Sequence, residues 1–365
     1  MKKIVVTGTR GIPDVLGGVE TVCEELFPRV VKYGFDVTII RRASYVHDGL
    51  TEYKGVELLD IKAPKRKSFE AIVHTLRAIW VARFRLKADI IHIHAIGPAL
   101  VTPFARLFGL KVVFTHHGPD YERDKWNKTA RFMLRLGERL GVGYANEVIV
   151  ISDVINALIQ KKYRRMDAHL IYNGTPKPHL ITDERYPVSL GLVPKQYIFA
   201  MGRFVPEKNF HQLIRAFTAL PDKRNGQLVI AGDADFEDDY ARELKSLARQ
   251  TGVVLTGFIK GAPLHALLSH ARAFVLPSSH EGLPLSLLEA MSYDLPVLVS
   301  DIPAHLEIKL PPDAYFPVGD EEQLSEKLGQ LLDVMPFRRK YPSDLYQWDT
   351  IAEQTVNVYR KIEIN

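Results

Sequence analysis

Two glutamates in the C-terminal half, Glu281 and Glu289, are the residues whose types and spacing most clearly suggest chemistry. The first lies in a segment that contains Gly and Pro, and the second lies within an apolar run of helical character. The preceding residues 273–277, AFVLP, predict a buried parallel strand, so Glu281 is expected at the carboxyl edge of a sheet, where open α/β folds bind ligands. Glu289 follows about two helical turns later, so both carboxylates can face one crevice. Such a pair could serve as general acid and base or could hold a ligand.

Two cations, Arg203 and Lys208, lie between a predicted strand at 197–200 and a predicted helix at 210–217. The planar fork of an arginine and the mobile point charge of a lysine suit a diphosphate, and the amides of a helix N-terminus add positive potential. Taken alone, such a pair is more often part of a solvated loop. Together with the two glutamates in the same half, it predicts a binding site for a diphosphate.

In the N-terminal half, Gly17 and Gly18 precede a predicted helix at 19–26. Glycines at such a place let the backbone approach a phosphate or a sugar closely. The sequence has neither GxGxxG nor GxxxxGK[ST] at this place. The motifs that would indicate a dinucleotide-dependent oxidoreductase or a P-loop enzyme are therefore missing here.

The histidines allow several interpretations. His117 follows a predicted strand at 111–114 and precedes Gly118, where it could orient a polar ligand or only cap the strand end. His92 and His94 share one face of a predicted strand at 90–93, but no third ligand has suitable spacing, so the sequence predicts no metal site there.

Short β-branched runs separated by helix-like segments predict parallel sheets with helices on both faces. One set lies in each half of the chain, and the segment 178–194 between them is rich in turn-forming residues. We therefore expect an α/β protein with two Rossmann-like domains whose parallel sheets face a central cleft. The expected parts are a first domain at 1–178, a second domain at 179–347 and a C-terminal helix at 348–365.

The composition agrees with a folded protein of two domains, since 365 residues with 46% hydrophobic content can fill two cores. The single cysteine, Cys23, excludes a disulfide within the chain, which fits a reducing cytoplasm. The start MKKIVV is too short for a secretory signal and reads as a first strand, and no apolar stretch approaches the roughly 18 residues of a membrane span.

The net charge of +5 is distributed unevenly. Residues 1–185 carry 30 Lys and Arg against 20 Asp and Glu, which leaves an excess of negative charge in the remainder. The densest basic segment, 62–87, alternates cations with apolar residues at helical spacing. It could be an amphipathic helix on an anionic membrane surface, or a core-facing helix with a solvated basic face. The residues concerned are Lys62, Lys65, Arg66, Lys67, Arg77, Arg83, Arg85 and Lys87, with Ile72, Leu76, Ile79, Trp80 and Phe84.

These motifs resemble the GT-B glycosyltransferases of family GT4, which use retaining chemistry. The resemblance spans nearly the whole chain, and the C-terminal block is the more specific part: Gly202-Arg203 with Lys208, Ala231-Gly-Asp233, Thr256-Gly-Phe258, and 277–303 with both glutamates. The opening GTRGIP with Gly17-Gly-Val-Glu20 is similar to a subgroup of bacterial surface-polysaccharide enzymes, some of them named rhamnosyltransferases.

The resemblance implies that the domain at 1–178 binds the acceptor, that the domain at 179–347 binds the donor, and that the helix at 348–365 crosses back to the first domain. It also implies a role for each matching position. Arg203 and Lys208 would neutralise the leaving nucleotide diphosphate, Glu289 would hold the ribose, and Glu281 would contact the transferred sugar. Phe258 and Ile259 would cover the base, Gly17 and Gly18 would bring N–H groups to the donor phosphates, and His117 would orient the sugar. Where many relatives have a glycine, this chain has Pro284, which has no N–H, so contacts from that loop must come from Leu285 and Ser286.

The expected reaction transfers a hexosyl group from a nucleotide-diphosphate sugar to a glycan or a lipid-linked saccharide in bacterial polysaccharide synthesis. No cofactor and no metal ion are expected, since the first domain has no Asp-x-Asp triplet and the two cations can stabilise the leaving group. The expected location is the cytoplasm, with a possible site at the inner face of the membrane, and no nucleic acid partner is expected. Two alternatives stay open: a nucleotide-sugar 2-epimerase of the same fold, and a non-catalytic subunit that binds nucleotide sugars.

Overall fold

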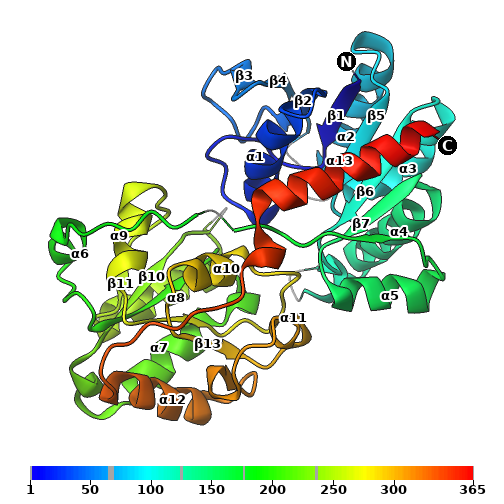
Figure 1. Ribbon diagram of the computed structural model, residues 1–365. Helices are drawn as coiled ribbons and strands as arrows, with labels where there is room; N and C mark the ends of the chain where they lie inside the picture. Colours follow the sequence, from blue (N-terminus) through cyan, green and yellow to red (C-terminus); the bar gives the residue numbers. More distant parts are fainter. Residues whose placement is uncertain (1, 65–69, 124–125, 176, 235–236, 365) are drawn as a thin grey trace. The chain divides into compact units, whose positions relative to one another are not determined.

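A computed structural model describes residues 2–64, 70–123, 126–175, 177–234 and 237–364. The chain forms two compact units (Figure 1). Unit 1 comprises residues 1–174 together with 345–365, and unit 2 comprises residues 175–344. The boundary at 174 and 175 precedes the turn-rich segment 178–194, in which the sequence places the junction.

Unit 1 is built on a sheet whose described strands run in the order β3-β4-β2-β1-β5-β6-β7-β8. All neighbouring strands are parallel except β3 and β4, which are antiparallel. The central strands β1, β5 and β6 are rich in β-branched residues and are buried except at the first residue of β1 and of β6, as expected for a sheet covered on both faces. The bounds are β1 (Lys3–Thr7), β2 (Asp36–Arg42), β3 (Glu52–Tyr53), β4 (Val56–Ile61), β5 (Ile90–His94), β6 (Lys111–His116), β7 (Glu147–Val150) and β8 (His169–Leu170).

The helices of unit 1 include one from the far end of the chain. The C-terminal helix α13 lies beside α1 in this unit (Figure 1). Its Tyr359 is fully buried and shares a hydrogen bond with the sheet residue His92, so the return of the chain completes the core of unit 1. The bounds are α1 (Gly18–Val31), α2 (Glu70–Trp80), the π-helical turn η1 (Val81–Arg85), α3 (Thr102–Leu107), α4 (Lys128–Tyr144), α5 (Asp153–Tyr163) and α13 (Trp348–Ile364).

Unit 2 contains a second parallel sheet, with the described strands in the order β11-β10-β9-β12-β13-β14. Side chains from its strands and from α7, α8 and α12 share one core that includes Ile198, Phe217 and Leu328. The strands are β9 (Tyr197–Met201), β10 (Gln227–Ala231), β11 (Val254–Leu255), β12 (Ala273–Leu276), β13 (Val297–Ser300) and β14 (Tyr315–Phe316). The helices are α6 (Arg185–Ser189), α7 (Phe210–Thr218), α8 (Asp239–Thr251), α9 (Ala262–His270), α10 (Leu285–Ser292), α11 (Pro303–Leu306) and α12 (Glu321–Asp333).

The predicted basic helix at 62–87 corresponds to α2 followed directly by η1. Lys65, Arg66 and Lys67 lie outside the described residues. Ile79 is buried in the core of unit 1, whereas Trp80 and Phe84 are exposed. The segment therefore packs on the unit with one face and presents aromatic side chains as well as cations on the other. Within the described part of the chain, no helix is long and apolar enough to span a bilayer.

Candidate functional site

In unit 2, Lys208 and Glu281 form an ion pair although they are 73 residues apart in the sequence. Lys208 ends the short 3-10 turn η4 (Pro206–Lys208) after β9, and Glu281 follows β12. These two strands are neighbours in the sheet, so the segments that follow them meet at one carboxyl edge. The Lys208 Nζ lies 2.5 Å from the Glu281 Oε1, and both side chains are largely buried.

The charge on Glu281 is maintained by this pairing. Burial by itself would raise the pKa of Glu281, but the Lys208 ammonium and the hydrogen bond that it donates lower the pKa below its usual value. His305 is buried nearby, and its pKa is lowered to about 4, mainly by burial. The pair therefore places one fixed positive and one fixed negative charge at the edge where open α/β sheets bind ligands.

Backbone contacts hold the two segments together. The Asn209 side chain donates from Nδ2 to the carbonyl of Pro277 at 3.0 Å, and the Ser279 N–H donates to the carbonyl of Glu207 at 2.9 Å. From β13, the Ser300 hydroxyl donates to the carbonyl of Ser278 at 2.5 Å. These contacts make the geometry of the ion pair a property of the backbone rather than of two mobile side chains.

Arg203 lies in the same segment as Lys208, two residues after the end of β9, and is partly exposed. The adjacent Gly202 lets this segment pack closely. A Cβ atom at Gly202 would approach the Lys208 Cε to 3.3 Å, while a Cβ at Gly232 would lie 1.9 Å from the Gly202 carbonyl oxygen. The segments after β9 and β10 thus touch through the backbones of Gly202 and Gly232.

The second glutamate of the motif, Glu289, lies within α10 and is partly exposed. The helix begins at Leu285, with Pro284 at the N-cap position, where the missing N–H of proline removes no helical hydrogen bond. The carbonyl of Pro284 accepts from the Leu287 and Leu288 amides. The amides of Leu285 and Ser286 precede these and belong to the first turn, whose N–H groups have no acceptor within the helix.

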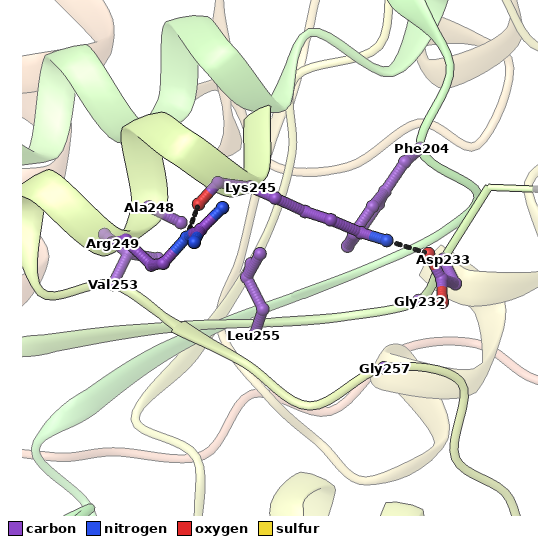
Figure 2. A pocket seen from close by; sticks show the side chains of 9 residues that line it. All are labelled: Phe204, Gly232, Asp233, Lys245, Ala248, Arg249, Val253, Leu255 and Gly257. Atoms are coloured by element: carbon purple, nitrogen blue, oxygen red, sulfur yellow. Dashed lines mark hydrogen bonds and ion pairs between the residues drawn. The ribbon is translucent and has the colours of Figure 1, made fainter. Parts of the chain in front are cut away.

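A cavity of about 370 Å³ adjoins the segments after β10 and β11 (Figure 2). Figure 2 shows the Lys245 side chain reaching from α8 toward Asp233, and the Lys245 Nζ lies 3.1 Å from the Asp233 Oδ1. The cavity is lined by nine residues: Phe204, Gly232, Asp233, Lys245, Ala248, Arg249, Val253, Leu255 and Gly257. The predicted base-covering residues Phe258 and Ile259 come directly after Gly257 but do not line the cavity, and Phe258 is exposed.

In unit 1, the segment between β1 and α1 is organised by Arg10 and Glu20. The Glu20 carboxylate is buried; it accepts from the Arg10 N–H at 2.9 Å and pairs with the Arg10 guanidinium at 3.2 Å. Burial raises the pKa of Glu20, but the charge and hydrogen bonds of Arg10 bring it below the usual value. A Cβ at Gly17, whose φ is 150°, would collide with both of these side chains, whereas a Cβ at Gly18 would meet open space.

His117 follows β6 and is half-buried. Its Nε2 lies 2.9 Å from the His94 Nδ1, and the two rings stack with centroids 5.2 Å apart. Burial lowers the pKa of His117 to about 4, so the ring is neutral near pH 7. A neutral imidazole in such a place can donate or accept a single hydrogen bond to a ligand.

The structure thus groups the predicted site residues into two sets. Unit 2 holds Arg203, Lys208, Phe258, Ile259, Glu281, Leu285, Ser286 and Glu289, and unit 1 holds Gly17, Gly18 and His117. Sequence reasoning missed the residues that hold these in place, namely Arg10, Glu20, His94, Asn209 and His305. Arg10 and Glu20 left a signal, since both stand in the quoted motif around the glycines, and His94 was noted only because it shares a strand face with His92.

Two family models match the chain. The model described as Glycosyltransferase Family 4 matches residues 16–176, and the model described as Glycosyl transferases group 1 matches residues 183–347. Each match covers most of one unit. Together the matched residues account for most of the chain.

Curated relatives and a solved structure agree with these models. The uncharacterized glycosyltransferase YqgM of Bacillus subtilis is 30% identical over 216 residues, 58% of each chain. The Escherichia coli UDP-Gal:alpha-D-GlcNAc-diphosphoundecaprenol alpha-1,3-galactosyltransferase is 25% identical over 305 residues, 79% of this chain and 77% of the relative. The chain spans only about half the length of the first curated relatives that it matches. The solved structure of Anabaena Alr3699/HepE in complex with UDP and glucose superposes on this chain with a TM-score of 0.79 at 19% sequence identity. The match covers 99% of this chain and 100% of the Anabaena chain.

The described sheets, the matched models and the solved structure point to the same architecture, two α/β units built on largely parallel sheets. The predicted fold class and family are therefore confirmed. The chain belongs to the GT-B glycosyltransferases that join a Family 4 N-terminal domain to a group 1 C-terminal domain.

Proposed function

We propose that this protein transfers a hexosyl group from a nucleotide-diphosphate sugar to a glycan or lipid-linked saccharide in bacterial polysaccharide synthesis. The observation that carries the proposal is the Lys208–Glu281 pair at the carboxyl edge of a parallel sheet. The family membership supports a sugar transfer. The printed name of the galactosyltransferase relative supports a nucleotide-sugar donor and a lipid-diphosphate acceptor, and the complex of the Anabaena protein supports a UDP donor.

We propose for each site residue the role that the family resemblance implies. Lys208 and Arg203 stabilise the negative charge that develops on the leaving diphosphate, and Glu281 holds a hydroxyl of the transferred sugar. Glu289 binds the ribose hydroxyls, the amides of Leu285 and Ser286 donate to the donor, and the segment with Phe258 and Ile259 contacts the base. From unit 1, Gly17 and Gly18 offer backbone amides to the phosphates, and His117 orients the sugar.

We propose a retaining reaction without a metal ion. The acceptor oxygen attacks the anomeric carbon from the face of the leaving group, the bond between that carbon and the phosphate oxygen breaks, and the acceptor proton passes to a phosphate oxygen. The support is that Lys208, held 2.5 Å from Glu281, is a built-in cation with fixed geometry. Glu281 is committed to this ion pair, which makes it a poor covalent nucleophile.

The test begins with a thermal-shift screen of UDP-, GDP-, ADP- and dTDP-sugars, since a bound donor stabilises the fold. The stabilising donor is then incubated with EDTA-treated protein and with glycan or lipid-linked acceptors, and the product is examined by NMR. We expect a product with the anomeric configuration of the donor, formed without added cations. An inverted product, a trapped covalent intermediate or a requirement for Mg²⁺ or Mn²⁺ would contradict the mechanism. An epimer formed without acceptor would contradict the transfer itself.

Replacing Glu289 with alanine is expected to weaken nucleotide binding. A carboxylate that accepts from two ribose hydroxyls is worth about 1.5–3 kcal/mol, so Kd for the nucleoside diphosphate should rise roughly tenfold to a hundredfold. Isothermal titration calorimetry measures this change. The control is Glu326→Ala on α12, an exposed glutamate of the same unit, for which Kd should not change. Equal Kd values for the two variants would exclude the ribose role.

We further propose that unit 1 contacts an anionic membrane at the inner face of the cell membrane. The side chains of Trp80, Phe84 and Phe108 are 57%, 53% and 37% exposed. The ring of Phe84 lies between the other two, with its centroid 5.8 Å from that of Trp80 and 5.7 Å from that of Phe108. The exposed cations Arg77, Arg83, Arg85 and Lys87 lie close to Trp80 and Phe84 in the sequence. Exposed aromatic rings among cations suit the interface of a bilayer that contains anionic lipids.

The double substitution Trp80→Ser and Phe84→Ser is expected to reduce binding to phosphatidylglycerol vesicles at least tenfold. The exposed surface of two rings is lost, while the charge that attracts the protein stays. Vesicle co-sedimentation at low and high salt measures the effect, and wild-type binding should fall as salt screens the cations. Met335→Ser, at an exposed position of unit 2, is the control. Unchanged binding of the double variant would show that the aromatic trio does not touch the membrane.

A further inference from the structure

Three histidine rings stack at the carboxyl edge of the unit 1 sheet. His92 and His94 from β5 have ring centroids 4.2 Å apart, and His117 stacks on His94 from the end of β6. Both nitrogens of His92 are engaged at 2.6 Å, Nδ1 by the Tyr359 hydroxyl and Nε2 by the Thr115 hydroxyl. The inner end of the stack is therefore fixed to α13 and to β6.

The backbone at His117 is fixed by its neighbour His116. The Gly118 N–H can only donate, so the His116 Nδ1 accepts this bond at 3.1 Å, and Nε2 is the ring nitrogen that carries a proton. That nitrogen donates to the Glu138 Oε1 at 3.0 Å. Glu138 is fully buried and also accepts from the side chains of Tyr121, Lys162 and Tyr163. His116 thus cannot rotate without breaking a buried network.

The hydrogen-bond partners of His94 determine which tautomer His117 adopts. Burial lowers the pKa of His94 and of His117, so one proton lies between the His94 Nδ1 and the His117 Nε2. Among the described residues, the buried His94 Nε2 has no hydrogen-bond partner. If His117 donated, the proton of His94 would have to stay on this Nε2 as a buried, unpaired N–H, an arrangement that proteins rarely tolerate. The favoured state has His94 donating from Nδ1.

We propose that His94 is a positioning residue, which donates from Nδ1 to the His117 Nε2 and thereby keeps the His117 proton on Nδ1. His117 then offers its ligand a hydrogen-bond donor of fixed identity rather than a mixture of donor and acceptor. The consequence for catalysis rests on the sugar-orienting role proposed for His117. A sugar hydroxyl facing this nitrogen would be held as an acceptor.

The experiment uses the full-length protein labelled with ¹⁵N-histidine. The ¹⁵N shifts of His117, assigned by their loss in His117→Asn, should show a protonated Nδ1 and a bare Nε2. His94→Phe keeps a ring in the stack but removes the donor, and it should produce a mixture of His117 tautomers. His94→Asn places an amide N–H near the former Nδ1 and should restore the single tautomer, which a purely space-filling role of His94 does not predict.

Kinetics provide the second readout. His94→Phe should lower kcat roughly fivefold to tenfold, the loss expected for one ordered hydrogen bond, without changing Kd for the nucleoside diphosphate. A wild-type His117 protonated on Nε2, or a His94→Phe variant with an unchanged tautomer, would overturn the positioning role. If the tautomer shifts as expected while kcat stays constant, the positioning role stands and the sugar-orienting role of His117 fails.

Discussion

Replacing Lys208 with methionine is expected to lower kcat by about 10²–10³-fold, while Kd for the nucleoside diphosphate changes little. Removal of one preorganised group that stabilises a developing anion typically costs this much, about 2.7–4 kcal/mol. Methionine keeps an unbranched stem of similar length beside Gly202, so the change removes charge more than packing. Rapid-quench turnover with the donor identified by the screen, together with calorimetric titration of the nucleotide, separates the effects on catalysis and binding.

A matched control is available in the same unit. The Lys340 Nζ also lies 2.5 Å from a carboxylate, that of Asp294, but its side chain is 89% exposed. Lys340→Met removes the same charge and the same kind of ion pair at the surface, where such pairs contribute little. We expect wild-type turnover for this variant. Equal losses in both lysine variants would mean that the effect arises from net charge and would contradict the leaving-group role.

The Lys208–Glu281 contact adds a further expectation. Because each side chain stabilises the charge of the other, Glu281→Gln should lower turnover by itself, and the double variant should lose less than the two single losses combined. A double-mutant cycle on kcat measures this coupling. Additive losses would show that the ion pair does not couple the two residues during turnover.

The sequence predicted the long buried strands because most of their residues are β-branched or aromatic, as β1, β5 and β9 show. It missed β4, whose residues VELLDI alternate between buried and exposed positions and include two acidic side chains. The two-residue strands β8 and β14 leave no periodic pattern at all, and their pairing depends on neighbouring strands. Continuous burial can be read from sequence, whereas edge strands follow from tertiary context.

The site residues also fall into those that the sequence predicts and those that depend on tertiary context. Arg203, Lys208, Glu281 and Glu289 stand in a recognisable motif, so their presence in one domain could be predicted. The Lys208–Glu281 pair could not, since it requires that β9 and β12 be neighbours although β10 and β11 separate them in the sequence. Likewise, His94 meets His117 only because β5 pairs with β6 in a register that places His94 opposite Thr115.

The buried carboxylate of Glu138 is expected to determine the acid stability of unit 1. Burial opposes ionisation, but hydrogen bonds from His116, Lys162 and Tyr163 lower the pKa of Glu138 from 4.5 to about 2. A lowered folded-state pKa stabilises the protein above the unfolded-state value, and this contribution is lost as the pH falls from about 4.5 through about 2. The shift corresponds to roughly 3 kcal/mol.

Glu138→Gln should therefore destabilise unit 1 by about 3 kcal/mol at pH 7, since the amide supplies a donor where several donors already converge. The variant should also lose less stability than the wild type below pH 4.5. All three tryptophans, Trp80, Trp126 and Trp348, belong to unit 1, so urea unfolding followed by tryptophan fluorescence reports on this unit.

Asp183 is the control that shows whether a lowered pKa affects stability when the carboxylate is exposed rather than buried. The pKa of its carboxylate is also lowered to about 2, by Arg185, but the pair lies at the surface of unit 2. Because solvent screens an exposed pair, Asp183→Asn should leave both the stability and its pH dependence unchanged, as measured by urea unfolding followed by circular dichroism, which reports on both units. If Glu138→Gln proved equally neutral, the four-donor network around Glu138 would not hold the segment that carries His116 and His117. The fixed backbone on which the tautomer argument depends would then lose its support.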